Sequence, residues 1–317
     1  MTTTPDTATG TARATEYPLR RKKLRHSQGF LAFWLLAPAL LAVFGVIIYP
    51  TLRTLLISFF QVDSALATST PFVGLRNYVD VLTAHGFWSA AGRTLYFTVV
   101  STSFELVLGL VVAGLLNARF RGRWLFRTIV VIPWALPTIV NAAMWKGIFN
   151  AQYGSLNALL TQLHLIRDYH EWLGDPNTAL NMVILADVWK MTPLVAFFLL
   201  AGLTSIPTEL YEAARIDRAS WPQVFRSIVL PMLVPSISIV LVLRTIDAFK
   251  VFDIIYAMTR GGPVNSTQTI AFYAYTTAFS DQQFGLGSAL SYVIVLAILG
   301  LTTIYLRLLR RSEMSLL

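Results

Sequence analysis

The sequence contains no cysteine and few charged residues. The absence of cysteine among 317 residues excludes disulfide bonds, thiolate metal ligands and cysteine nucleophiles. Only 13% of the residues are charged, whereas an average soluble domain carries about 25%. The four histidines lack the spacing of metal ligands, and no nucleotide-binding loop of the type G-x-x-x-x-G-K-S/T is present. We therefore expect this chain to have no catalytic residues, no metal site and no bound cofactor.

Long apolar runs dominate the sequence instead, and 55% of all residues are hydrophobic. A helix of about 20 apolar residues crosses the hydrocarbon of a bilayer. Six stretches reach this length, at roughly residues 30–60, 95–116, 125–149, 180–203, 229–258 and 288–306. The sequence thus predicts an all-α polytopic membrane protein with about six transmembrane helices. The membrane domain would cover residues 30–310, between a basic, disordered tail at 1–29 and a short tail at 311–317.

Lysine and arginine are distributed unevenly between the predicted loops. Sixteen lie in the two tails and in the loops that follow the second and fourth runs, whereas the remaining loops hold only Arg76, Arg93, Arg167 and Arg260. Positive residues accumulate on the cytoplasmic side of membrane proteins. Both termini and the loop at 205–231 are therefore predicted to be cytoplasmic. The net charge of +9 is then explained by orientation in a lipid bilayer and does not indicate nucleic-acid binding.

The predicted cytoplasmic loop at 205–231 has the composition of a segment that docks to another protein. Pro207 is typical of a helix start and Pro222 punctuates the segment, so two short helices are expected. Ala213 and Ala214 are small enough for another protein surface to approach the backbone closely. The alternative is an amphipathic surface loop in which these alanines have no partner.

Two motifs in this loop resemble the coupling loop of permease subunits from binding-protein-dependent ABC importers. Glu212-Ala213-Ala214 and the later Ile228-Val229-Leu230-Pro231 match the family's E-A-A-x-x-x-G and I-x-L-P in type and spacing, but Arg218 replaces the motif's glycine. The resemblance covers about residues 30–310 and is most similar to the carbohydrate-importing branch of maltose and glycerol-phosphate type. Further matching stretches are Phe72–Tyr78, Tyr153–Asn157, Trp189-Lys190, Arg244–Asp253 and Thr259–Pro263.

The resemblance implies a permease subunit in the bacterial inner membrane that carries a sugar or sugar-like solute and does not hydrolyse ATP itself. Its implied partners are a second homologous permease, two copies of a cytosolic ABC ATPase that hold ATP and Mg, and an extracytoplasmic solute-binding protein. Disaccharides, longer oligosaccharides and phosphorylated glycerol derivatives all remain possible solutes. The residues implied in ATPase coupling are Tyr211, Glu212, Ala213, Ala214, Asp217, Arg218, Leu230 and Pro231.

Four charged residues alternate in sign within the fifth apolar run. Arg244, Asp247, Lys250 and Asp253 follow one another at a spacing of three. An unpaired charge at mid-bilayer costs roughly 2.5–3.5 kcal/mol on insertion scales. We therefore expect these residues to neutralise one another as a ladder that lines a polar cavity, where they either contact solute or bridge neighbouring spans.

Aromatic and amide side chains near these charges complete the candidate solute path. The candidates are Asp247, Phe249, Lys250, Phe252, Asp253, Trp134, Asn141 and Trp189. Asp187 and Lys190 repeat the charge spacing in the fourth run, where we interpret them mainly as a structural pair. Aromatic residues in spans also pack or form interfacial belts, and that interpretation stays open.

The second predicted external loop contains a short helix by its leucine spacing. An apolar stripe on this helix is predicted by Leu156, Leu159, Leu160 and Leu163.

Intramembrane charges and proline-broken helices also occur in ion-coupled secondary transporters, which we keep as the alternative function. That class does not explain a docking loop between the fourth and fifth spans. A membrane-bound enzyme or scaffold is disfavoured because no reactive constellation is visible.

Overall fold

The computed structural model describes residues 24–64, 66, 69–118 and 120–314, and its regular elements in this part are helices. Besides the helices, an isolated antiparallel bridge joins Phe60 to Phe72, and these described ranges contain no β-strand. The all-α prediction is therefore confirmed. The chain divides into two compact units, residues 1–54 and 55–317. The predicted basic run at 20–23 lies outside the described residues.

The first unit consists of helix over its described residues. Helix α1 (Leu24–Ala42) continues through a π-helical segment (Val43–Ile48) into α2 (Tyr49–Ile57), whose last turn belongs to the second unit. The 25-residue stretch Phe33–Ile57 is long and apolar enough to cross a membrane. None of its most apolar window is buried by the protein's own residues, as expected for a helix that contacts lipid or another subunit.

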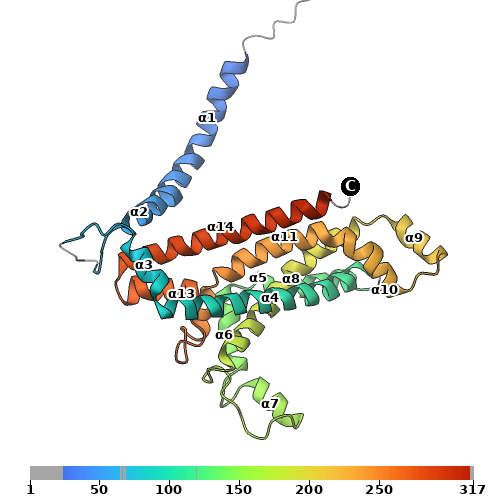
Figure 1. Ribbon diagram of the computed structural model, residues 1–317. Coiled ribbons are helices and arrows are strands. Elements are labelled where there is room, and N and C mark those ends of the chain that lie inside the picture. The colour runs from blue at the N-terminus through green and yellow to red at the C-terminus, as the bar shows by residue number, and fades with distance from the viewer. Residues whose placement is uncertain (1–23, 65, 67–68, 119, 315–317) are drawn as a thin grey trace, which may run out of the picture. The chain divides into compact units, whose positions relative to one another are not determined.

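Long helices form the body of the second unit. They are α4 (His85–Asn117), α8 (Ala179–Thr204), α11 (Leu230–Phe249) and α14 (Phe284–Met314), and α4, α11 and α14 run side by side in Figure 1. α4 packs along α8, α11 packs against both, and α14 packs on α11. At the α4–α8 contact a Cβ atom added to Gly109 would lie only 2.5 Å from Cγ1 of Val195. Glycine is therefore required for this close approach.

The third predicted span is broken into two helices. α5 (Arg123–Ala135) and α6 (Thr138–Ile148) meet at an angle of 94° around Leu136 and Pro137. Proline forces the preceding residue into an extended conformation, and Leu136 has φ −70° and ψ 135°. Five helices are long and apolar enough to cross a membrane, and the bent pair raises the number to six if it forms one span. This agrees with the prediction of about six transmembrane helices.

The predicted bounds of the fifth span are wrong at both ends. The helix begins at Trp221 with α10 (Trp221–Val224), continues through a π-helical segment (Phe225–Val229) and ends with α11 at Phe249. Residues 250–252 are not helical, and α12 (Asp253–Met258) is a separate short helix. The sequence could not locate this break because no proline or glycine marks it.

Short helices cover the two ends of this body. α3 (Arg76–Thr83) and α13 (Ile270–Tyr275) lie at one end, and α9 (Thr208–Ile216) lies at the other, between α8 and α10 (Figure 1). α7 (Ser155–Gln162) confirms the helix predicted from the leucine stripe; Leu156 and Leu160 are half-buried.

Gly109→Ala should destabilise the protein by about 1–3 kcal/mol, because the added methyl group overpacks the α4–α8 contact. The matched control is Gly114→Ala on the same helix, where a Cβ meets nothing within 4 Å. Alanine should there be neutral or stabilise the helix by up to about 1 kcal/mol. Thermal unfolding of the detergent-purified protein measures both changes. Equal melting temperatures for the two variants would contradict the close approach.

Candidate functional site

Arg244 of α11 lies between carboxylates from two other helices. Its guanidinium donates through Nε and Nη2 to Glu105 of α4, with Nη2 at 2.6 Å from Oε1, and Nη2 also donates to Asp187 Oδ2 of α8 at 2.9 Å. Arg244 is 2% exposed, Glu105 0% and Asp187 7%. A buried charge is tolerated only when it is paired and hydrogen-bonded. The three residues therefore join α4, α8 and α11 in one buried ion network.

Arg244 does not pair along its own helix as the predicted charge ladder required, but it does bridge neighbouring spans, which was the alternative kept for these charges. Asp247 and Lys250 do pair with each other, at 3.1 Å, and their side chains are 44% and 57% exposed. Asp253 is exposed at the start of α12 and forms no ion pair within the described residues. A spacing of three rotates successive side chains around the helix, so Arg244 can face the interior while the next pair faces outward.

The predicted pair between Asp187 and Lys190 is also replaced. The carboxylate of Asp187 forms its ion pair with the guanidinium of Arg244. Lys190 is buried on α8 and forms no ion pair in the part of the chain that the structure describes. The structural role proposed for Asp187 stays compatible with this geometry, but its partner comes from another span.

Glu105 was not singled out from the sequence because it stands alone in an apolar run. The available signal was its surroundings: Thr98, Ser101 and Thr102 share its face at helical spacing. All four side chains are buried, and the three hydroxyl oxygens find no hydrogen-bond partner among the described residues. α4 thus buries a polar stripe on the side that carries Glu105.

The candidate path residues are spread over several helices of the second unit. Asn141 is buried and donates to the Ala186 carbonyl at 3.3 Å, which places α6 against α8. Trp189 is half-buried on the same helix, and its ring lies edge-on to Trp145 at 5.8 Å. Trp134 is exposed on α5, away from any described aromatic partner.

Two aromatic candidates lie farther along the chain. Phe249 is half-buried at the end of α11. Phe252 stacks on Tyr256 with ring centroids 5.5 Å apart, and it lines a cavity of about 330 Å³ together with Tyr275 and Phe279. Aromatic rings are thus concentrated around α12 and α13, which pack against α8 and α4 respectively.

The loop at 205–231 forms a helix, a tight turn and the beginning of the fifth span. α9 starts at Thr208, directly after Pro207, as predicted. Arg218 has φ +53°, and the amide of Ala219 donates to the Ala214 carbonyl at 2.9 Å, which closes the C-terminus of α9. Arg218 therefore occupies the motif's glycine position in the left-handed conformation that favours glycine, at a cost of roughly 1–2 kcal/mol.

The second half of the loop differs from the prediction. Gln223 Oε1 accepts from the Ser220 amide at 2.7 Å in a capping box, and the helix that follows is continuous with α11. The expected second short helix is therefore the beginning of the fifth span. Leu230 and Pro231 lie where α11 begins; Leu230 is exposed and Pro231 is half-buried.

α9 has an inner and an outer face. Tyr211 is half-buried in an apolar cluster and Ala214 is buried, so both face the protein body. Burial raises the pKa of the Tyr211 hydroxyl above its ordinary value. On the outer face Ala213 and Asp217 are exposed, and Ile216 is 81% exposed. Ile216 is the apolar side chain of α9 that is most available to a partner.

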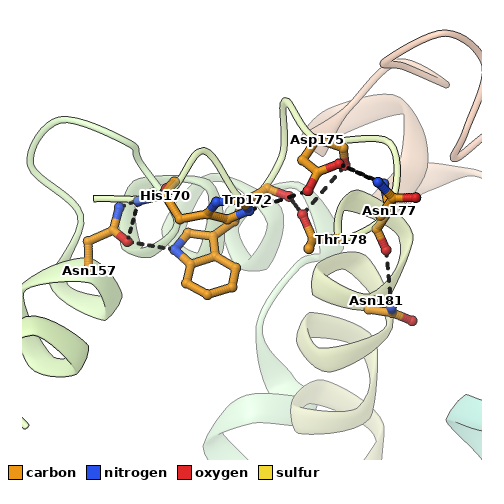
Figure 2. Close-up of polar contacts among 7 residues, drawn as sticks. All are labelled: Asn157, His170, Trp172, Asp175, Asn177, Thr178 and Asn181. Carbon is orange, nitrogen blue, oxygen red and sulfur yellow. Dashed lines mark hydrogen bonds and ion pairs between the residues drawn. The ribbon is translucent and has the colours of Figure 1, made fainter. Parts of the chain in front are cut away.

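The second predicted external loop is held by its own polar contacts, shown in Figure 2. Asn157 of α7 accepts from Trp172 Nε1 at 2.8 Å and donates to the His170 carbonyl at 2.9 Å. Thr178, just before α8, donates to the Trp172 carbonyl at 2.7 Å. Trp172 therefore links α7 to the start of α8, and the loop has a defined surface.

Comparison with known families and curated proteins gives a consistent result. The model of the family described as "Binding-protein-dependent transport system inner membrane component" matches residues 105–315. The chain is 43% identical over 285 residues to the trehalose/maltose transport system permease protein MalF of Thermococcus litoralis, across 90% of this chain and 95% of that protein. It is 36% identical over 283 residues to the sulfoquinovosyl glycerol transport system permease protein SmoG of Agrobacterium fabrum, across 89% and 91%.

Solved structures show the same fold. A bacterial ABC transporter involved in the import of the acidic polysaccharide alginate contains a chain that matches with a TM-score of 0.76 at 23% identity, across 90% of this chain and 99% of that one. A bacterial alginate ABC transporter in complex with an alginate pentasaccharide-bound periplasmic protein gives a TM-score of 0.78 at 22% identity, across 92% and 98%.

Arg218→Gly should stabilise the protein by about 1 kcal/mol, because glycine adopts a positive φ without the clash of a Cβ atom. Arg215→Gly is the matched control, since Arg215 lies inside α9. There glycine should destabilise the helix by about 1 kcal/mol. Thermal unfolding of the purified variants distinguishes them, and destabilisation by both would show that the turn does not need glycine-like backbone freedom.

Proposed function

Because the chain belongs to the family of binding-protein-dependent transport system inner membrane components, we propose that it forms part of the path by which an ABC importer takes up a sugar. The chain is a permease and not an enzyme, since the ATPase of these importers is a separate subunit. The observation that carries the coupling mechanism is α9, which exposes Ala213 and Ile216 at one end of the helical body.

The proposed solute is a small glycoside. Support comes from relatives whose names specify trehalose and maltose or sulfoquinovosyl glycerol, and which match about nine-tenths of this chain. The half-exposed Asp247–Lys250 pair offers acceptors and donors to sugar hydroxyls. Asn141, Trp189, Phe249, Phe252 and Asp253 remain candidates for solute contact. Trp134 would contact solute only if the path extends to the exposed side of α5.

The proposed assembly contains a second homologous permease, two cytosolic ABC ATPases and an external solute-binding protein. The second permease is inferred from the family to which this chain belongs. ATP and Mg would bind to the ATPases. Both termini and α9 would lie on the cytoplasmic side, so the loop around Asn157 and Trp172 would meet the binding protein.

In the proposed coupling, the fifth span transmits movement of α9 to the interior of the permease. Trp221–Phe249 is 29 residues of continuous helix, which corresponds to about 40 Å at 1.5 Å per residue. A displacement of α9 by ATPase closure would pass through the turn at Arg218 into this helix. The far part of the same helix carries Arg244 and Asp247. Movement at the ATPase would therefore reach both the buried ion network and the proposed path.

Ala213→Arg and Ile216→Glu should each reduce co-purification of the ATPase with the permease, and uptake of labelled trehalose or maltose, by about tenfold or more. Ala213→Arg places charge and bulk on the outer face of α9, and Ile216→Glu replaces an exposed apolar side chain there by a charged one. Ala118→Arg is the control: it adds the same side chain to an exposed position after α4, at the same end of the body. Undiminished ATPase binding and uptake in both α9 variants would refute the docking role.

A further inference from the structure

A polar cavity of about 680 Å³ lies between the inner side of α9 and the ends of α4, α5 and α8. Its walls include Tyr211, Glu212 and Arg215 from α9 and Arg123 from α5. Glu212 and Arg215 are exposed, so the cavity opens to the surface. The volume falls within the range of about 300–1,000 Å³ that is typical of small-molecule sites.

Among the described residues, the charged side chains that line this cavity have no ion-pair partner. Arg123 and Arg215 stand on different helices, and neither forms an ion pair or a side-chain hydrogen bond with any described residue. The same holds for the carboxylate of Glu212 within the described ranges. Two guanidinium groups against one carboxylate leave an excess positive charge. Guanidinium groups bind phosphate oxygens through paired hydrogen bonds.

A third arginine lies beside the cavity with an unsatisfied donor. Arg127 follows Arg123 by one turn of α5, and its Nη2 is 3.5 Å from the carbonyl of Leu116, the neighbour of the cavity residue Asn117. Arg127 Nε is buried and has no hydrogen-bond partner among the described residues. A buried donor left without a partner costs about 1–3 kcal/mol. An anion in the cavity would supply an acceptor near this group.

Apolar side chains next to the cavity indicate where the anion comes from. Trp124 is 72% exposed directly after Arg123, and Leu125 and Phe120 are also exposed. Tryptophan is enriched where membrane hydrocarbon meets the headgroups. In the proposed orientation this end of the body lies at the cytoplasmic leaflet, so a lipid could place its acyl chains against α5 and its headgroup in the cavity.

We propose that this cavity binds the headgroup of a membrane phospholipid, with the phosphate between Arg123 and Arg215. Hydroxyl or ammonium groups of the headgroup would donate to Glu212. The lipid would connect α9 to α5 and so hold the coupling helix against the protein body. The site goes beyond sugar transport and depends on the proposed function only for the membrane side on which it lies.

Lipid retention by the full chain, extracted from membranes with its co-purifying subunits, tests this site. After incubation with dioctanoyl phosphatidylglycerol, native mass spectrometry should show one retained lipid for each copy of this chain. The Arg123→Gln/Arg215→Gln double variant should reduce occupancy by about tenfold. Arg226→Gln is the control, because Arg226 is exposed on the helix that follows the same loop and does not line the cavity; it should retain the lipid.

Two further measurements, a competition experiment and a cavity-filling variant, complete the test. Inorganic phosphate and dioctanoylglycerol, added at the same concentration, should not displace the lipid. Inorganic phosphate lacks the acyl chains, and dioctanoylglycerol lacks the phosphate. Thr204→Trp, which fills the cavity and keeps both arginines, should lose the lipid even if the double variant fails to assemble. Equal retention by wild type and both cavity variants would overturn the site, and displacement by inorganic phosphate would overturn the lipid assignment. Neither measurement depends on ATP turnover. The lipid site and the sugar-importer proposal can therefore fail independently of each other.

Discussion

Arg244 and its two carboxylate partners constitute the interaction on which the rest of this structure depends. Glu105, Asp187 and Arg244 come from α4, α8 and α11, and each is almost fully enclosed. Removing Arg244 would leave two buried carboxylates without their cation, and the loss of one partner of a buried pair typically costs about 3–5 kcal/mol. The network therefore fixes the rotation of three helices at once. Hydrophobic contacts alone would not fix it, because lipid is as apolar as the helices it surrounds.

This rotation determines what the fifth span presents elsewhere. With Arg244 turned inward, Asp247 and Lys250 remain half-exposed beside it, where a solute could reach them. The same helix extends without interruption to Trp221 and the turn that carries α9. One continuous helix thus joins the proposed docking helix, the ion network and the proposed solute path. A phospholipid beneath α9 would add a second connection between the docking helix and the body.

The sequence predicted the architecture well because apolar length alone decides which segments can cross a membrane. It also placed the start of α9 at Pro207, where local chemistry is sufficient, whereas Arg218 stood out only because the resembled motif has glycine at that position. It indicated a bend at Pro137 but not its size of 94°, since a proline permits a kink whose size depends on tertiary packing. The end of α11 at Phe249 carried no local signal at all.

The candidate site was predicted less well, for a related reason. Charges were grouped along one helix by their spacing, but Arg244 found its partners on two other helices. Glu105 went unnoticed because a single carboxylate in an apolar run forms no pattern. The ion-coupled transporter was a reasonable alternative for intramembrane charges in general. It is not retained, because the chain belongs to the inner membrane components of binding-protein-dependent transport systems.

A double-mutant cycle on Glu105→Gln and Arg244→Met tests the central role of the ion network most directly. The free energy of unfolding would be measured in detergent–SDS mixtures for the wild type, both single variants and the double variant. The account predicts a coupling energy of about 2 kcal/mol or more, since Arg244→Met leaves the Glu105 carboxylate buried without its cation, a charge that the double variant removes, while Asp187 loses the same partner in both backgrounds. Effects that add to within about 0.5 kcal/mol would contradict it, and would show that the three helices are positioned without this interaction.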